Sequence, residues 1–329
     1  MYNSEVKYYN YDQVFIIPEY SDITTRMEVD TSIKLGDLTL QVGIIASNMD
    51  TISESRMCST LWRAGAIGAL HRFMPIGSNA EEYLKVRESN AECFVSVGVN
   101  GDWEERAKAL YDVGARYFII DIAHGHSKMM KDTVKTFRKL LPASDVFIMG
   151  GNITTPESVS DLENWGVDAC KLGLAGGFVC LTKDVTGVIV PMFTAIQQCS
   201  AVAKKPIIAD GGARSYADIC KAIGAGATAV MSGWFFAGTD EVPETAKQKN
   251  HTDGSEHFIY RGSASKDVMS KTRSVNLPTA EGKSIEVSYK GSAVNIIKDI
   301  AGGLRSSYSY VGASNTETFQ AKVKFGIKG

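Results

Sequence analysis

Short apolar segments rich in β-branched residues recur along the chain, and longer segments with helical patterns lie between them. Each short segment is nearly continuous in hydrophobicity, which is typical of parallel strands that are covered on both faces. We predict eight strands, at residues 43–49, 66–71, 93–99, 117–123, 146–151, 168–173, 206–212 and 228–233.

The segments between these strands carry the start and stop signals of helices. Thr155 is the expected N-cap of one helix, and Pro156 follows it in the first turn. Glycines close the helical patterns, as expected of C-terminal caps. Four such segments are residues 53–65, 104–114, 155–166 and 215–226. Strand and helix alternating eight times predict an α/β fold, a (β/α)8 TIM barrel.

Two segments lie outside the predicted barrel. Residues 1–42 form an N-terminal arm, in which we expect an extra strand or hairpin. Residues 239–290 are polar, show no strong periodicity and follow the eighth strand, so we predict an irregular flap that begins at the catalytic face. We expect residues 1–329 to form a single catalytic domain with no inserted regulatory domain.

Composition and charge exclude several classes of protein. The chain has 329 residues, of which 44% are hydrophobic, so it can bury a large core. Its net charge of −2 offers no basic surface to nucleic acid or to an anionic membrane. The polar N-terminal segment does not resemble a secretory signal. The six cysteines have no metal-binding spacing, and we expect Cys93 and Cys170 to be reduced core thiols in a cytoplasmic protein.

Polar residues follow most of the predicted strands, at the end where TIM barrels place their active sites. Cys180 lies on a glycine-rich loop at this rim, where it is placed to act as a nucleophile, with Thr182 aiding proton transfer. The alternative is a loop cysteine without a role. Other polar residues at strand ends are Asn48, Asp50, His71, Arg72, Asp121, His124, Asn152, Asp210 and Ser232.

Two further patterns allow two interpretations each. Gly211, Gly212 and Gly233 end the last two strands, where they form either a phosphate site or simple tight turns. Residues 121–126 contain an aspartate and two histidines. Because no fourth ligand with suitable spacing is visible, a loop aspartate that caps a helix is favoured there over a metal site.

Eight ordered motifs give the chain a resemblance, nearly end to end, to the inosine-monophosphate dehydrogenase and guanosine-monophosphate reductase family. They are YDQVFIIPEYSDI (11–23), ASNMDT (46–51), DIAHGHS (121–127), KLGLAGGFVCLTK (171–183), ADGG (209–212), YRGSAS (260–265), EGKSIEVSYKG (281–291) and GGLRSSYSYVGA (302–313). The reductase branch is the closer one. No regulatory domain pair interrupts the chain after HRFMP (71–75), DIAHGHS and EGKSIEV resemble the reductases, and the Arg-Tyr pair that activates water in the dehydrogenases is not found at the corresponding place.

The resemblance implies an NADPH-dependent oxidoreductase that converts GMP (or dGMP) to IMP and ammonia through a covalent thioimidate on Cys180. It implies a proton relay of Thr182 and Glu281, with Arg72 in place of a catalytic lysine. The implied substrate contacts are Asn48, Met49, Asp210, Gly211, Gly212, Gly233, Trp234, Tyr260, Arg261, Gly262 and Ser263. The implied cofactor contacts are Asp121, Ala123, His124, Gly125 and Ser265. It also implies a homotetramer and a K⁺ ion on the carbonyls of Ala175, Gly177 and Cys180.

Departures from the family pattern leave the substrate open. The loop has Ala175 where the family has a glycine and Gly176 where it has a proline, and Phe178 and Trp234 replace small or polar residues near the phosphate. Lys183 replaces an arginine of many members. The alternatives are a GMP reductase with a remodelled pocket, a related purine reductase or dehydrogenase (IMP dehydrogenase-like, or with a modified purine), and a non-catalytic nucleotide-binding member. We expect Thr182 and Glu281 to meet only when the flap closes, and residues 265–285 to be mobile without ligand.

Overall fold

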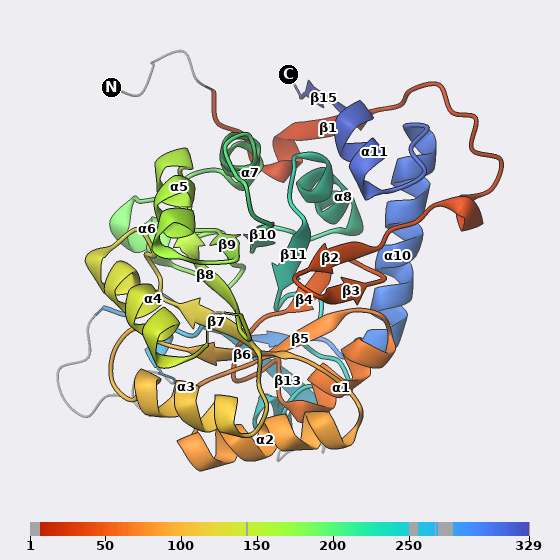
Figure 1. Cartoon of the computed structure of the whole chain (residues 1–329). Coiled ribbons are helices and arrows are strands. Elements are labelled where there is room, and N and C mark those ends of the chain that lie inside the picture. The colour runs from red at the N-terminus through yellow and green to blue at the C-terminus, as the bar shows by residue number, and fades with distance from the viewer. Residues whose placement is uncertain (1–6, 143, 250–255, 267, 269–278, 329) are drawn as a thin grey trace.

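The computed structural model describes residues 7–142, 144–249, 256–266, 268 and 279–328. Eight parallel strands close into a barrel, and helices surround it (Figure 1). In barrel order the strands are β4 (Ile44–Ala46), β5 (Ile67–Leu70), β6 (Phe94–Val97), β7 (Tyr117–Asp121), β8 (Phe147–Ile153), β9 (Ala169–Leu172), β10 (Ile207–Asp210) and β11 (Ala229–Ser232). All eight predicted strands and the TIM barrel are therefore confirmed.

Helices lie in the four segments that the sequence predicts and between the other strands, and two more, α10 and α11, follow the eighth strand. They are α1 (Ser55–Arg63), α2 (Ile76–Glu88), α3 (Trp103–Asp112), α4 (Lys128–Leu140), α5 (Pro156–Trp165), α6 (Thr182–Thr186), α7 (Met192–Ser200), α8 (Tyr216–Gly224), α10 (Ala293–Tyr310) and α11 (Thr316–Lys322). Thr155 caps α5 by accepting a hydrogen bond from the Ser158 amide, and Pro156 opens the helix. Both capping predictions are confirmed. Among the described residues, no helix has the length and apolar character that crossing a membrane requires.

The barrel interior is built from every second residue of the strands. Ile119, Ala169 and Ile208 belong to one buried cluster inside the barrel. Ile33, Leu35 and Leu40 belong to the same cluster and come from the hairpin of β2 (Ile33–Leu35) and β3 (Leu38–Leu40). The hairpin expected in the N-terminal arm is thus confirmed, and its side chains pack onto the interior of the barrel.

The N-terminal arm also contains β1 (Val14–Ile17), which pairs antiparallel with β15 (Lys324–Ile327) near the end of the chain. Figure 1 shows this two-stranded ribbon beside α11. Short 3₁₀ helices lie at Tyr11–Gln13 and Arg26–Glu28. The pattern of the sequence did not predict β15, because half of this short strand is exposed and it carries a glycine.

The prediction of an irregular flap at residues 239–290 is wrong for its described part. A 3₁₀ turn (Glu244–Ala246) leads into an antiparallel sheet of β12 (Lys247–Lys249), β13 (Glu256–Arg261) and β14 (Ser284–Val287). These strands face solvent on one side and alternate apolar and polar residues over only a few positions. Such a weak period-two signal is easily read as a loop. Residues 250–255, 267 and 269–278 of the predicted flap lie outside the described residues.

Candidate active site

A buried lysine organises the top layer of the barrel interior. Successive side chains of a strand point to opposite faces, so Lys171 projects on the same side as the interior residue Ala169. Its ammonium group donates to Asp121 Oδ1 at 3.0 Å, to Asp210 Oδ2 at 2.8 Å and to Asn152 Oδ1. Gly151 leaves the space for it, because a Cβ there would lie 2.3 Å from the Lys171 carbonyl. From β9, Lys171 therefore holds residues of three other strands, β7, β8 and β10.

Charge pairing inside this cluster outweighs the cost of burial. Burial alone would raise the pKa of Asp121, but the charges of Lys171 and Arg72 and hydrogen bonds from Lys171 and Asn48 lower it. Burial alone would lower the pKa of Lys171, but Asp121 and Asp210 raise it. Asp121 and Lys171 are thus both charged across the neutral range. Asp210 Oδ2 also accepts from Asn152 Nδ2, whereas its Oδ1 accepts no hydrogen bond within the described part of the chain.

A second group of side chains forms a path for a proton. The Cys180 thiol is partly exposed and donates to Thr182 Oγ1 at 3.2 Å. The Thr182 hydroxyl in turn donates to Glu281 Oε2 at 2.7 Å. This path connects a solvent-accessible nucleophile to a carboxylate through one hydroxyl.

Backbone pairing holds the two halves of this path together. The Leu181 amide donates to the Glu281 carbonyl at 2.7 Å, and the Lys283 amide donates to the Val179 carbonyl at 2.9 Å. Gly282 forms bridges with both Cys180 and Ser265. A Cβ on Gly282 would lie 2.9 Å from the Ser265 amide nitrogen, so only glycine permits this close approach. We expected Thr182 and Glu281 to meet only when the flap closes. In this structure the two side chains are already in contact.

Tyr260 stands between the two groups. It is 3% exposed, and burial together with the nearby Asp210 and Cys180 raises its pKa. Its hydroxyl and the Met49 sulfur each lie 2.8 Å from the place that a Cβ on Gly233 would occupy. The predicted substrate residues Met49, Gly233 and Tyr260 are therefore brought together beside the aspartate and the cysteine.

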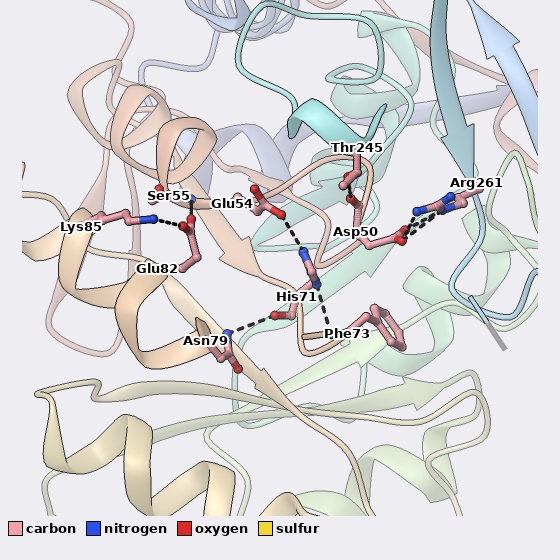
Figure 2. A network of polar contacts seen from close by, with 10 residues as sticks. All are labelled: Asp50, Glu54, Ser55, His71, Phe73, Asn79, Glu82, Lys85, Thr245 and Arg261. Atoms are coloured by element: carbon pink, nitrogen blue, oxygen red, sulfur yellow. Dashed lines mark hydrogen bonds and ion pairs between the residues drawn. The ribbon is translucent and has the colours of Figure 1, made fainter. Parts of the chain in front are cut away.

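Two predicted arginines occupy different environments. Arg261 is buried, and its Nε donates a hydrogen bond to Asp50 Oδ2 at 3.0 Å. Figure 2 shows this pair. This ion pair joins β13 to the loop after β4, so we assign Arg261 to holding the sheet rather than to direct substrate contact. Arg72 lies near Asp121, whose pKa it lowers, and its Nε is buried without a hydrogen-bond partner.

Figure 2 also shows how His71, beside Arg72, is held. Its Nε2 lies 3.3 Å from Glu54 Oε1, and its Nδ1 accepts from the Phe73 amide at 3.1 Å. The Asn79 side chain donates to the His71 carbonyl at 3.2 Å. The loop that carries Arg72 is therefore anchored at its first residue.

The histidine-rich run after β7 does not gather around a metal. Asp121 pairs with Lys171, His126 Nε2 lies 2.9 Å from Asp161, and His124 is exposed. Among the described residues no group of three metal-ligating side chains occurs. The K⁺ prediction rests on backbone carbonyls instead. One of these, the Gly177 carbonyl, already accepts from the Cys180 amide at 3.1 Å, and K⁺ stays a prediction.

The remaining predicted residues line the same rim. Gly211 and Gly212 have positive φ values of 91° and 81°. Gly125 donates its amide to the Asn152 carbonyl at 2.6 Å, and Ala123 beside it is exposed. Asn48 and Gly262 are buried, Ser263 is half-buried, and the Ser265 hydroxyl is buried without a hydrogen-bond partner.

Sequence reasoning overlooked Lys171 as a member of the site. A signal was present, because a lysine inside an otherwise apolar strand must find buried anions. Residues 119 and 208 are apolar and inward, and the aspartates two positions later continue the same face. Extending this alternation along residues 169–171 would have placed Lys171 between them.

The model of the IMP dehydrogenase / GMP reductase domain matches residues 8–328. The chain belongs to this family. A GMP reductase of Chromobacterium violaceum is 36% identical over 307 residues, with 93% of each chain covered. An inosine-5′-monophosphate dehydrogenase of Nitrosopumilus maritimus is 29% identical, covering 96% of this chain and 94% of the relative.

Solved structures of the family have the same fold. GMP reductase from Trypanosoma brucei in complex with guanosine 5′-monophosphate superposes with a TM-score of 0.90 at 28% identity, covering 99% of this chain and 96% of the other. Inosine 5′-monophosphate dehydrogenase from Legionella pneumophila gives a TM-score of 0.87 at 40% identity, with 98% and 99% covered. Both branches of this oxidoreductase family are thus similar to the chain.

Proposed function

We propose that this protein catalyses the NADPH-dependent reductive deamination of a guanine-containing substrate at purine C2, the reaction that the resemblance implies for GMP. The observation that carries the proposal is the connected path from Cys180 through Thr182 to Glu281. A partly exposed thiol, a hydroxyl and a carboxylate in this order are the groups that a covalent mechanism at C2 requires.

The path first generates the nucleophile. A thiolate attacks more readily than a thiol, so Cys180 must lose its proton as the sulfur approaches C2. The Thr182 hydroxyl accepts that proton while passing its own to the Glu281 carboxylate. Both contacts are already within hydrogen-bond distance, so little rearrangement is needed before attack.

The same proton leaves with the amine. Bond formation between Cys180 Sγ and C2 is followed by cleavage of the bond from C2 to the exocyclic nitrogen. Glu281 and Thr182 return the proton to this nitrogen, which departs as ammonia and leaves a thioimidate on Cys180. Substrate and thiol together therefore balance thioimidate and ammonia. Asp210 Oδ1, which accepts no hydrogen bond from the described residues, is available to accept from a ribose hydroxyl.

The residues predicted for the nicotinamide side fit such a group. The Ser265 hydroxyl is buried, has no hydrogen-bond partner among the described residues and lies next to Gly282, one residue from Glu281. Asp121 is held in place by Lys171 at the same rim. NADPH, when bound, supplies the hydride that replaces sulfur on C2. Glu281 then takes up a proton from solvent, and Thr182 passes it on to Cys180 Sγ to restore the thiol.

The dehydrogenase similarity supports a second candidate, the oxidation of an inosine compound with a nicotinamide cofactor. In that reaction no ammonia is lost when the thioimidate on Cys180 forms. Water must instead cleave the thioimidate to release the product. Reduction of NADP⁺ or NAD⁺ with an inosine substrate would favour it. The choice of NADPH over NADH, the homotetramer and the cytoplasmic location stay predictions.

The decisive experiment combines NADPH absorbance with mass spectrometry of the intact protein. We expect a guanine nucleoside or nucleotide to oxidise NADPH and, without NADPH, to add a purine mass to Cys180. Cys180→Ala should abolish both, while Cys220→Ala, which removes a buried thiol in α8, should retain both. If no guanine or inosine compound changes NADPH or NADP⁺ absorbance and none labels Cys180, the enzymatic assignment is wrong.

A further inference from the structure

Two aromatic side chains stack across the rim of the barrel. Phe178 lies on the loop after β9 and Trp234 on the loop after β11, with ring centroids 4.1 Å apart and ring planes 25° apart. Strand β10 lies between β9 and β11 in the barrel. The stack therefore spans the end of β10, where Gly211 and Gly212 turn the chain.

This corner is where TIM barrels commonly bind phosphate, between the loops after the seventh and eighth strands. Here Met192 and the two stacked rings lie beside the glycines. A Cβ on Gly212 would lie 3.1 Å from Met192, and one on Gly176 would lie 3.5 Å from the Gly212 amide nitrogen. Trp234 also packs toward Tyr260, with ring centroids 6.5 Å apart. Side chains that bind a phosphate are usually short and polar, or cationic. Phe178 has no polar group, and Trp234 has only the single indole N–H.

The cations near the corner lie over the aromatic rings. Arg214 lies 5.2 Å and Lys283 5.9 Å from the centroid of Phe178, and Lys290 lies 4.5 Å from that of Trp234. Lys290 Nζ also donates to the Trp234 carbonyl. These contacts stabilise the stack through the negative faces of the rings. Burial lowers the pKa of Lys290 to about 8.

The site does contain residues suited to the base and to the ribose of a purine compound. Cys180 is set for C2 of the base, and Asp210 Oδ1 is open to a ribose hydroxyl. We propose that the substrate of this site is a purine nucleoside with an unphosphorylated 5′ carbon, and that the Phe178–Trp234 stack occupies the space of the phosphate. This inference rests on the proposed function for the reacting position, but it concerns only the far end of the substrate.

Calorimetric titration of the unmodified protein with guanosine and with GMP tests the proposal directly. We expect guanosine to bind at least about tenfold more tightly, because GMP must desolvate its phosphate without gaining charged hydrogen bonds. The kcat/KM values for NADPH oxidation should follow the same order. The double variant Phe178→Ser, Trp234→Ser should reduce or invert the preference, whereas the conservative variant Trp234→Phe should keep it.

Three results would count against the proposal. Tighter binding of GMP than of guanosine to the unmodified protein overturns it, as does the absence of binding of both. An unchanged preference in the folded double variant, verified by its melting curve, also overturns the role of the stack. Tight guanosine binding without NADPH oxidation or labelling of Cys180 leaves the specificity standing and refutes the proposed reaction instead.

Discussion

Thr182 Oγ1 and Glu281 Oε2 lie 2.7 Å apart, although 99 positions separate the two residues in the sequence. Substitution Glu281→Gln keeps the size and a hydrogen-bond acceptor but removes the proton acceptor. We expect kcat to fall by about 10²–10⁴, the usual contribution of general acid–base catalysis. Steady-state NADPH oxidation measures this loss. Glu286→Gln, an exposed change on β14, which follows Glu281 in the sequence, is the matched control and should retain the rate.

Lys171→Met tests the buried cluster. The change leaves the half-buried Asp121 and Asp210 without their shared cation, so the free energy of unfolding should fall by about 3–5 kcal/mol. Urea denaturation gives this value. Lys128→Met removes an exposed pair with Asp132 and should leave the unfolding midpoint nearly unchanged. Equal shifts in the two variants would show that the cluster contributes nothing beyond a surface pair.

Lys290 gives stability a specific dependence on pH. Its pKa is about 8 in the folded protein against an ordinary value of 10.5. Between these values the unfolded chain holds a proton that the folded protein has released, so the free energy of unfolding rises with pH in this window. Below pH 8 the residue contributes no slope. Urea denaturation between pH 7 and pH 10.5 should show a rise that Lys290→Met removes and that Lys298→Met, at an exposed site on α10, retains.

Gly282→Ala tests the close packing of residue 282, next to Glu281, against the backbone of residues 264 and 265. The added Cβ would meet the Ser265 amide nitrogen at 2.9 Å and the Ala264 carbonyl carbon at 3.0 Å, and neither backbone atom can move freely. We expect a loss of kcat, because Glu281 is displaced from Thr182. Gly302→Ala, with no atom within 4 Å of its Cβ, should instead stabilise α10 by about 0.5–1 kcal/mol. A Gly282→Ala protein with the normal rate would contradict this account of the flap.

The barrel was predictable because its signals are local and repeated. Continuous apolar runs mark its strands, and residues such as Thr155 and Pro156 mark the start of a helix independently of the rest of the fold. The sheet formed by β12, β13 and β14 lacked such signals. Its stability depends on distant contacts, among them the ion pair of Arg261 with Asp50, which no local pattern reveals.

The candidate site was predictable only in part. A cysteine after a glycine-rich loop and a threonine two residues later stand out in sequence, but the contact of Thr182 with Glu281 depends on the folded flap. Lys171 was not predicted because the alternation of inward-facing residues was not followed from Ala169 to position 171. The stacking of Phe178 on Trp234 joins two loops that local reasoning treats separately, so the sequence indicated two unusual residues but not their contact.

The pairing of β1 with β15 has a consequence for biosynthesis. Val14–Ile17 emerges from the ribosome early, yet its partner in the described chain is made more than three hundred residues later. Until β15 is made, the backbone groups of this segment have no strand to pair with and can pair with another nascent polypeptide. Pairing with Lys324–Ile327 removes this risk of aggregation. A chain truncated before residue 324 would keep β1 unpaired.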